Sequence, residues 1–197
     1  MSQGLDRFGC LENRIKVAQG HYVDLIDPDP EMIDIRSIAA ALSKVCRFGG
    51  HCPKFYSVAE HCVHAAARAE ADGLGSGVVG AILMHDAAEA YIGDMVKPLK
   101  VKLPDFLEVE QRMESAIDKR FGLAMHHHAA VVKDYDRMML KAEKLALWPE
   151  DSEHWEGFET IPIREIKFGW WSPREAELQF LVAARRHLVV SFQETGL

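Results

Sequence analysis

The sequence predicts an all-α protein that carries a small β-hairpin near its N-terminus. After residue 34, apolar side chains recur at intervals of three and four residues, which places them on one face of successive helices. Ser57 and Ser172 each precede a glutamate by three residues, a pattern typical of a helix start. Before residue 27, two short β-like runs flank Gln19-Gly20, as in a hairpin.

Length and composition favour a single soluble domain over residues 1–197. Apolar residues make up 48% and charged residues 27% of the 197, and a chain of this size buries roughly two-thirds of its unfolded surface. We expect the core at about residues 34–148. The net charge of −7 argues against tight binding of long nucleic acid, although a small anionic substrate needs only a local cationic pocket.

The sequence carries no recognisable membrane or targeting signal. Its apolar runs are too short to span a bilayer, and no basic segment followed by an apolar one opens the chain. The four cysteines lack the Cys-x-x-Cys spacing of zinc knuckles and redox motifs. We therefore expect a cytoplasmic protein in a reduced compartment, with no membrane partner.

The first elements are expected to be the hairpin, at residues 14–26, and a helix that follows it. The run Asp27-Pro28-Asp29-Pro30 reads as the turn that ends the hairpin. From Asp34, a suitable N-cap, the period changes to that of a helix, which we expect to continue to about Cys46.

A loop rich in glycine, cations and aromatic residues follows, over residues 47–56. It is either a solvated connector or a substrate-binding loop, and we favour the second interpretation. A guanidinium such as that of Arg47 binds phosphate through two hydrogen bonds, and Phe48 or Tyr56 can stack on a base.

The second helix is expected to begin with a capping box made by Ser57 and Glu60 and to run to about residue 70. His61 then lies in its first turn. His64 follows three residues later, and we assign it to packing or to the surface rather than to a metal.

The third helix is expected to begin near Ser76, to be buried, and to carry His85, Asp86 and Glu89. Consecutive helical residues point about 100° apart, so His85 and Asp86 reach one ion only if it lies against the helix flank. Glu89 projects over the same face. A His-Asp pair alone is a weak signal, but imidazole with carboxylate suits a divalent metal that activates water, which predicts a hydrolase.

The residues just beyond Glu89 admit two interpretations. Asp94 follows a glycine and either caps a turn or contacts the substrate. Lys97 and Lys100 are either solvated or in contact with the substrate, and we weigh these two alternatives equally.

Three further helices are expected at about residues 105–121, 129–147 and 173–190. The consecutive histidines 126–128 are interpreted as a polar helix start, because they cannot all face one ion. Asp134 and Asp136 lie among core-directed residues, so at least one is expected to have a cation or metal as partner, although from these residues alone a solvated face is the favoured interpretation. Residues 150–160 are acidic and aromatic, and we expect an exposed loop there.

The chain resembles the HD-domain metal-dependent phosphohydrolases in four features: Ser57-x-x-Glu60-His61, His85-Asp86-x-x-Glu89, Gly93-Asp94 and a late helical aspartate. The closer likeness is to the 5′-deoxynucleotidase-like branch, including its prophage-associated members, and it covers about residues 35–147. The resemblance implies an all-α HD-domain bundle, in agreement with the helix pattern.

The resemblance also implies a ligand set for one divalent metal, consisting of His61, His85, Asp86 and Asp136. Asp136 is preferred to Asp134 because Val132-Lys133-x-x-Asp136 matches the family's late motif.

The remaining site residues follow from the same resemblance. Glu89 would handle protons near the scissile phosphate, and Asp94 would orient Glu89 or the sugar. Arg47 would bind phosphate, with Lys97 assisting. Phe48 stands where the best-known members carry tryptophan against the sugar, so sugar discrimination stays open.

The expected function is hydrolysis of deoxynucleoside 5′-monophosphates to nucleoside and phosphate. The cofactor would be one divalent ion, Co, Mn, Zn or Mg, and a second ion bound with the substrate phosphates is left open. One alternative is a deoxynucleoside triphosphate triphosphohydrolase, acting for example on dATP. Another is a nucleotide-binding regulator without catalysis. The expected partners are a small nucleotide and, as the resemblance implies, further copies of the chain in a homo-oligomer.

Overall fold

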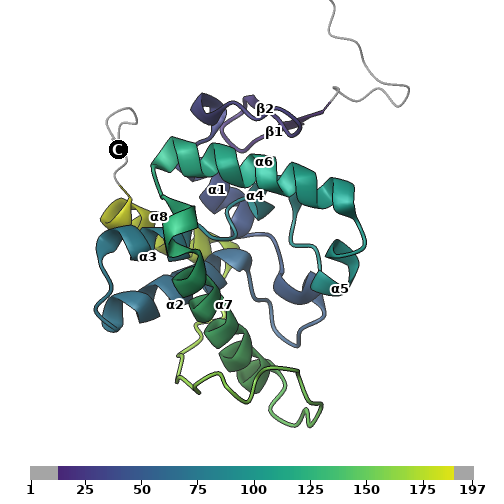
Figure 1. Cartoon of the computed structure of the whole chain (residues 1–197), viewed down its shortest axis with the longest axis vertical. Coiled ribbons are helices and arrows are strands. Elements are labelled where there is room, and N and C mark those ends of the chain that lie inside the picture. Colours follow the sequence, from purple (N-terminus) through teal and green to yellow (C-terminus); the bar gives the residue numbers. More distant parts are fainter. Residues whose placement is uncertain (1–12, 189–197) are drawn as a thin grey trace, which may run out of the picture.

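The computed structural model of the protein describes residues 13–188. This part of the chain is mostly helical and carries a two-stranded antiparallel hairpin, which confirms the predicted fold class (Figure 1). The strands are β1 (Arg14–Lys16) and β2 (Tyr22–Asp24). The helices are α1 (Ile35–Leu42), α2 (Val58–Ala71), α3 (Ser76–Leu83), α4 (Glu89–Ile92), α5 (Lys97–Lys100), α6 (Pro104–Phe121), α7 (Met125–Leu147) and α8 (Pro173–His187). Short 3-10 turns form at Pro30–Met32 and Arg47–Gly50.

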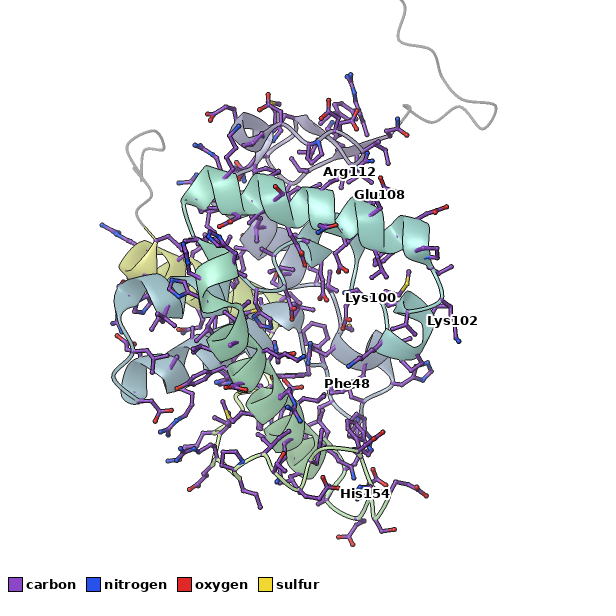
Figure 2. All side chains as sticks on the ribbon, viewed as in Figure 1. Phe48, Lys100, Lys102, Glu108, Arg112 and His154 are labelled. Carbon is purple, nitrogen blue, oxygen red and sulfur yellow. The ribbon has the colours of Figure 1, made fainter. Side chains whose placement is uncertain are left out.

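The hairpin lies against the outer side of α6 (Figure 1). Ile15 pairs with Val23, and the side chain of Val23 is buried in the main core. Arg112 of α6, labelled in Figure 2, donates a hydrogen bond of 3.0 Å to the carbonyl of Ile26. The hairpin therefore covers α6 and lies apart from the residues of the predicted site.

The core is formed where α2 packs against α3 and α8, and α1 packs against α8. The long helix α7 lies across α2 and α3. A Cβ atom on Gly80 of α3 would lie 3.0 Å from the carbonyl oxygen of His187, so the glycine allows α8 to approach α3 closely. Among residues 13–188, none of the helices combines the length and apolar character that a membrane crossing requires.

The first helix ends at Leu42 and not near Cys46, so the predicted boundary was wrong. Asp34 caps it as expected, accepting a 2.8 Å hydrogen bond from the amide of Ser37. Cys46 is extended and forms a β-bridge with Ser57. Backbone hydrogen bonds on both sides of this bridge close the loop that carries Arg47 and Phe48.

The third helix also ends early, at Leu83, and the expectation that His85, Asp86 and Glu89 share one continuous helix was wrong. Residues 84–88 form successive turns, in which amides bond to carbonyls three residues back. Nδ1 of His85 forms a 2.7 Å hydrogen bond with the carbonyl oxygen of Ile82. In a continuous α-helix, that oxygen would instead accept a hydrogen bond from a backbone amide. The helix resumes at Glu89 as α4.

The predicted capping box at α2 is only half formed. The side-chain oxygen of Ser57 accepts a 3.2 Å hydrogen bond from the backbone amide of Glu60, as predicted. The Glu60 carboxylate does not complete the capping box. It accepts hydrogen bonds of 2.8–2.9 Å from three consecutive backbone amides, those of Gly169, Trp170 and Trp171. It also lies 3.2 Å from the ring of His64, which packs on the aromatic side chains of the same segment, so the packing role predicted for His64 is confirmed.

The later helices follow their predictions with small differences. Helix α7 begins at Met125 rather than near residue 129, so the three histidines lie in its first turn, as a polar helix start. The last helix ends at His187, since Leu188 is extended, so the predicted end near residue 190 was wrong by a few residues. The loop after α7 is held to that helix by Arg137, Lys141 and Lys144, which donate to its carbonyls.

Candidate metal centre

Four side chains from three separate elements converge beside α7. His61 comes from the first turn of α2, His85 and Asp86 from the turns after α3, and Asp136 from α7. The Nε2 atoms of His61 and His85 are 3.2 Å apart. Asp86 Oδ2 lies 3.2 Å from Nε2 of His85 and 3.7 Å from that of His61. His61, His85 and Asp86 thus form a cluster able to hold a metal ion.

Asp136 is the fourth member of this group. Its Oδ1 lies 3.5 Å from Nε2 of His61 and 3.8 Å from Nε2 of His85. Asp134 is exposed and lines a different cavity, together with Asp72 and Arg164. The geometry therefore favours Asp136 over Asp134 as a ligand.

Hydrogen bonds fix which ring nitrogen of each histidine faces the cluster. A carbonyl only accepts, so His85 must donate from Nδ1 to Ile82, which leaves the Nε2 lone pair free. Nδ1 of His61 is likewise engaged, by the carboxylate of Glu143. Both Nε2 atoms therefore present lone pairs to the same point.

Two imidazoles and a carboxylate this close together can hold a cation, and Asp136 lies beside them. Burial lowers the pKa of both rings, and Arg47 lowers that of His61 further, but the nearby carboxylates together raise the pKa of each ring above its ordinary value: Asp86 and Asp136 for His85, and Glu143 and Asp136 for His61. Two ligands of one ion with bonds of about 2.1 Å lie at most about 4.2 Å apart. The distances given above all fall below that limit, so these residues fit a divalent metal.

Glu143 is a residue that the sequence interpretation missed. It is fully buried and joins three partners: the His61 ring, the hydroxyl of Tyr56 at 2.8 Å and the guanidinium of Arg47 at 3.0 Å. Burial opposes its charge, but Arg47 and His61 outweigh it and lower the pKa of Glu143 to about 2. One signal could have revealed it: Glu143 follows Asp136 by seven residues, which is two helical turns on the same face of α7.

Arg47 lies beside the cluster. Its guanidinium is 3.5 Å from Asp86 and 3.0 Å from Glu143, and its Nε is buried with no hydrogen-bond partner among the described residues. That unpaired donor leaves capacity for an anion. Phe48, predicted to meet the sugar, has a left-handed backbone and packs edge to face on Trp148, with ring centroids 5.0 Å apart.

Two further carboxylates lie near the cluster. Glu89 is buried, and its Oε2 has no hydrogen-bond partner among the described residues. Burial, together with the charges of Asp86 and Asp94, raises the pKa of Glu89 to about 10. Burial also raises the pKa of Asp94. Glu89 is therefore suited to hold a proton at neutral pH.

Lys100 of α5 lies on the same side of the molecule as Phe48 (Figure 2). Lys100 forms an ion pair with Glu110 and is close enough to Glu89 and Asp86 for their charges to raise its own pKa, although burial opposes this. Lys97, at the other end of α5, is exposed. Lys100 is thus the better placed of the two to act on a ligand at the cluster.

Comparisons with known proteins assign the chain to a family. No family model matches it. It is 37% identical over 145 residues to the uncharacterized protein YfdR of Escherichia coli K12, covering 74% of this chain and 77% of that protein. The chain belongs to the YfdR family. The uncharacterized protein RCAP_rcc00048 of Rhodobacter capsulatus is 35% identical over 146 residues, which covers 68% of this chain and 74% of that protein.

Neither relative's name states an activity, so the function of this YfdR-family protein has to be argued from its own site. The site combines two imidazoles, two carboxylates, a buried guanidinium and a buried carboxyl group beside one another. A bound divalent ion at such a site can polarise a phosphoryl oxygen and lower the pKa of bound water.

Proposed function

We propose that this YfdR-family protein is a metal-dependent phosphohydrolase of the HD-domain type, and that it hydrolyses deoxynucleoside 5′-monophosphates to nucleoside and phosphate. The observation that carries the proposal is the cluster of His61, His85 and Asp86, with Asp136 beside the two imidazoles. The motifs that contain these residues resemble those of HD-domain phosphohydrolases, in the branch that includes 5′-deoxynucleotidases.

The residues around the cluster supply the parts that phosphate ester hydrolysis needs. The cluster would hold the divalent ion, which supplies Lewis acid chemistry and an acidified water. Arg47, whose buried Nε lacks a partner, would neutralise charge that builds on the phosphoryl oxygens. Glu89, with its unpaired Oε2, would deliver a proton to the leaving 5′ oxygen. Asp94 would keep that proton on Glu89 through its negative charge.

A second candidate activity is removal of triphosphate from deoxynucleoside triphosphates such as dATP. Lys100 favours it, because this cation lies near Glu89 and Asp86 and could pair with additional phosphates. Lys97 and Lys102 flank it on the same short segment. Both activities would use the same metal centre, so only the products distinguish them.

The deciding experiment is chromatography of the products formed from a panel of deoxynucleoside mono- and triphosphates, with cobalt, manganese, zinc or magnesium added. Orthophosphate from the monophosphates alone supports the nucleotidase, whereas intact triphosphate supports the second candidate. His85→Ala should abolish either activity. His154→Ala is the control, because His154 lies exposed on the loop after α7, away from the cluster (Figure 2).

Survival of every substrate with all four metals would contradict both activities. Calorimetric titration of the metal-loaded protein with the same nucleotides would then decide the remaining class. Binding without turnover would indicate a nucleotide-binding regulator.

A further inference from the structure

A cavity of about 550 Å³ is lined mainly by residues of α6 and the first half of α7. These two helices meet at an angle (Figure 1). His85 and Asp136 belong to its wall and also to the metal cluster. The cavity therefore borders the point at which a ligand phosphate would meet the cluster. Its volume lies within the range of about 300–1,000 Å³ that is usual for small-molecule sites.

The lining of this cavity suits a flat ring that carries a few polar groups. Met84, Ile117 and Val132 contribute apolar side chains. Gln111, Ser115 and Lys133 add donors and acceptors on the two helices that border it. Apolar walls with a small number of polar groups are typical of sites that bind a heterocycle.

The opposite side of the cluster offers less room. Arg47 is buried there between Asp86 and Glu143, and the ring of Phe48 is covered on one side by Trp148. Three other cavities include none of the four cluster residues. One lies between α7 and residues 160–164, one between residues 26–30 and α6, and one between the hairpin and residues 27–32. Of these four cavities, the one between α6 and α7 is thus the one whose lining includes cluster residues.

We propose that the cavity between α6 and α7 binds the nucleoside part of the substrate, with the base between Ile117 of α6 and Val132 of α7. This inference rests on the proposed function, because it assumes that a nucleotide phosphate occupies the cluster. Lys133 and Gln111 then meet the polar edge of the base. The cavity thereby gives the protein its preference for nucleotides over simple phosphate esters.

The experiment fills the cavity without replacing a cluster residue. Ala129→Trp places a large ring into it, because Ala129 lines the cavity from α7. Ala130→Trp is the matched control, since Ala130 is the next residue of α7, is exposed and does not line the cavity. Hydrolysis of deoxynucleoside monophosphates is compared with that of p-nitrophenyl phosphate, which has no nucleoside.

We expect Ala129→Trp to lower kcat/KM for the deoxynucleotides at least about tenfold, mainly through KM, and to leave p-nitrophenyl phosphate hydrolysis unchanged. Ala130→Trp should resemble the wild type with both substrates. Equal kcat/KM for deoxynucleotides in Ala129→Trp and Ala130→Trp would overturn the inference.

A second measurement separates failure of the inference from failure of the proposed function. Deoxyadenosine and thymidine, which lack phosphate, are titrated into the metal-loaded protein by calorimetry. Binding that Ala129→Trp removes and Ala130→Trp retains supports the cavity even if no substrate is hydrolysed. If neither nucleoside binds the wild type while its deoxynucleotides are hydrolysed, the proposed function stands and the cavity assignment is wrong.

Discussion

At the scale of single residues, Glu143 decides how the metal centre is oriented. Its carboxylate engages Nδ1 of His61 and so leaves Nε2 to face the cluster, and it holds Arg47 from the other side. Carboxylates behind ligating histidines keep the ring and its tautomer in place. We therefore expect Glu143→Gln to weaken metal binding about 10–100-fold. Titration of the metal-free protein with cobalt, followed by visible absorption, measures this and reports the ligand geometry.

The control for this prediction is Glu110→Gln. Glu110 is also a buried acid, but it pairs with Lys100 and not with a cluster residue. It should leave cobalt affinity and spectrum as in the wild type. An unchanged affinity in Glu143→Gln would show that His61 needs no support from α7.

Glu89 provides a second prediction at this scale. Because its buried carboxyl group is suited to hold a proton, Glu89→Gln should lower kcat about 10²–10⁴-fold, the range usual for loss of a general acid. Cobalt affinity should stay the same, since Glu89 is not a member of the cluster. Retention of kcat in the presence of a full complement of metal would exclude Glu89 as the proton donor.

The sequence could indicate the residues of the centre that lie in local motifs. His85, Asp86 and Glu89 stand within five positions of one another, so their proximity is encoded by the backbone alone. Glu143 could not be found in this way, because its partners His61 and Arg47 lie 82 and 96 positions earlier in the chain. Only tertiary packing of α7 against α2 brings them together.

At the scale of elements, the segment before α8 is fastened to α2 by Glu60. Removing that carboxylate in Glu60→Ala would leave three part-buried amides of residues 169–171 without their acceptor, and an unsatisfied group costs about 1–3 kcal/mol when it is fully buried and less when water can reach it. We expect a loss of at least about 2 kcal/mol in the free energy of unfolding. Urea denaturation measures it.

Glu165→Ala is the comparison for Glu60→Ala. Glu165 lies in the same segment but is exposed, so its removal should change stability little. Equal unfolding midpoints for the two variants would mean that residues 169–171 are not held by Glu60.

Helical periodicity located α2, α6 and α7 because each buries one continuous stripe. It failed at residues 84–88, where a side chain competes with the backbone for a carbonyl group. The pattern of apolar residues does not reveal that competition. The ring of His85 occupies a carbonyl that an α-helix would use. Helical periodicity also failed to predict the role of Glu60. A glutamate at this position fits a capping box, and it equally fits a carboxylate that accepts hydrogen bonds from distant amides.

At the scale of the whole molecule, the metal centre joins α2, the turns after α3, and α7. An ion bound only by the folded state stabilises it by RT ln(1 + [L]/Kd), which is about 2.7 kcal/mol at a free concentration of 100 Kd. We therefore expect cobalt or manganese to raise the melting temperature of the metal-free protein measurably. The increase should disappear in His85→Ala and persist in His154→Ala. An equal increase in both variants would place the ion elsewhere.

The binding of residues 169–171 to Glu60 also bears on how the chain is made. Glu60 emerges from the ribosome more than a hundred residues before the amides that donate hydrogen bonds to its carboxylate. Until they arrive, α2 cannot bury this carboxylate without a large cost in desolvation. The helix that bears His61 therefore reaches its final environment only when synthesis is nearly finished. A chain that stops short of this point would keep an uncompensated carboxylate beside His61.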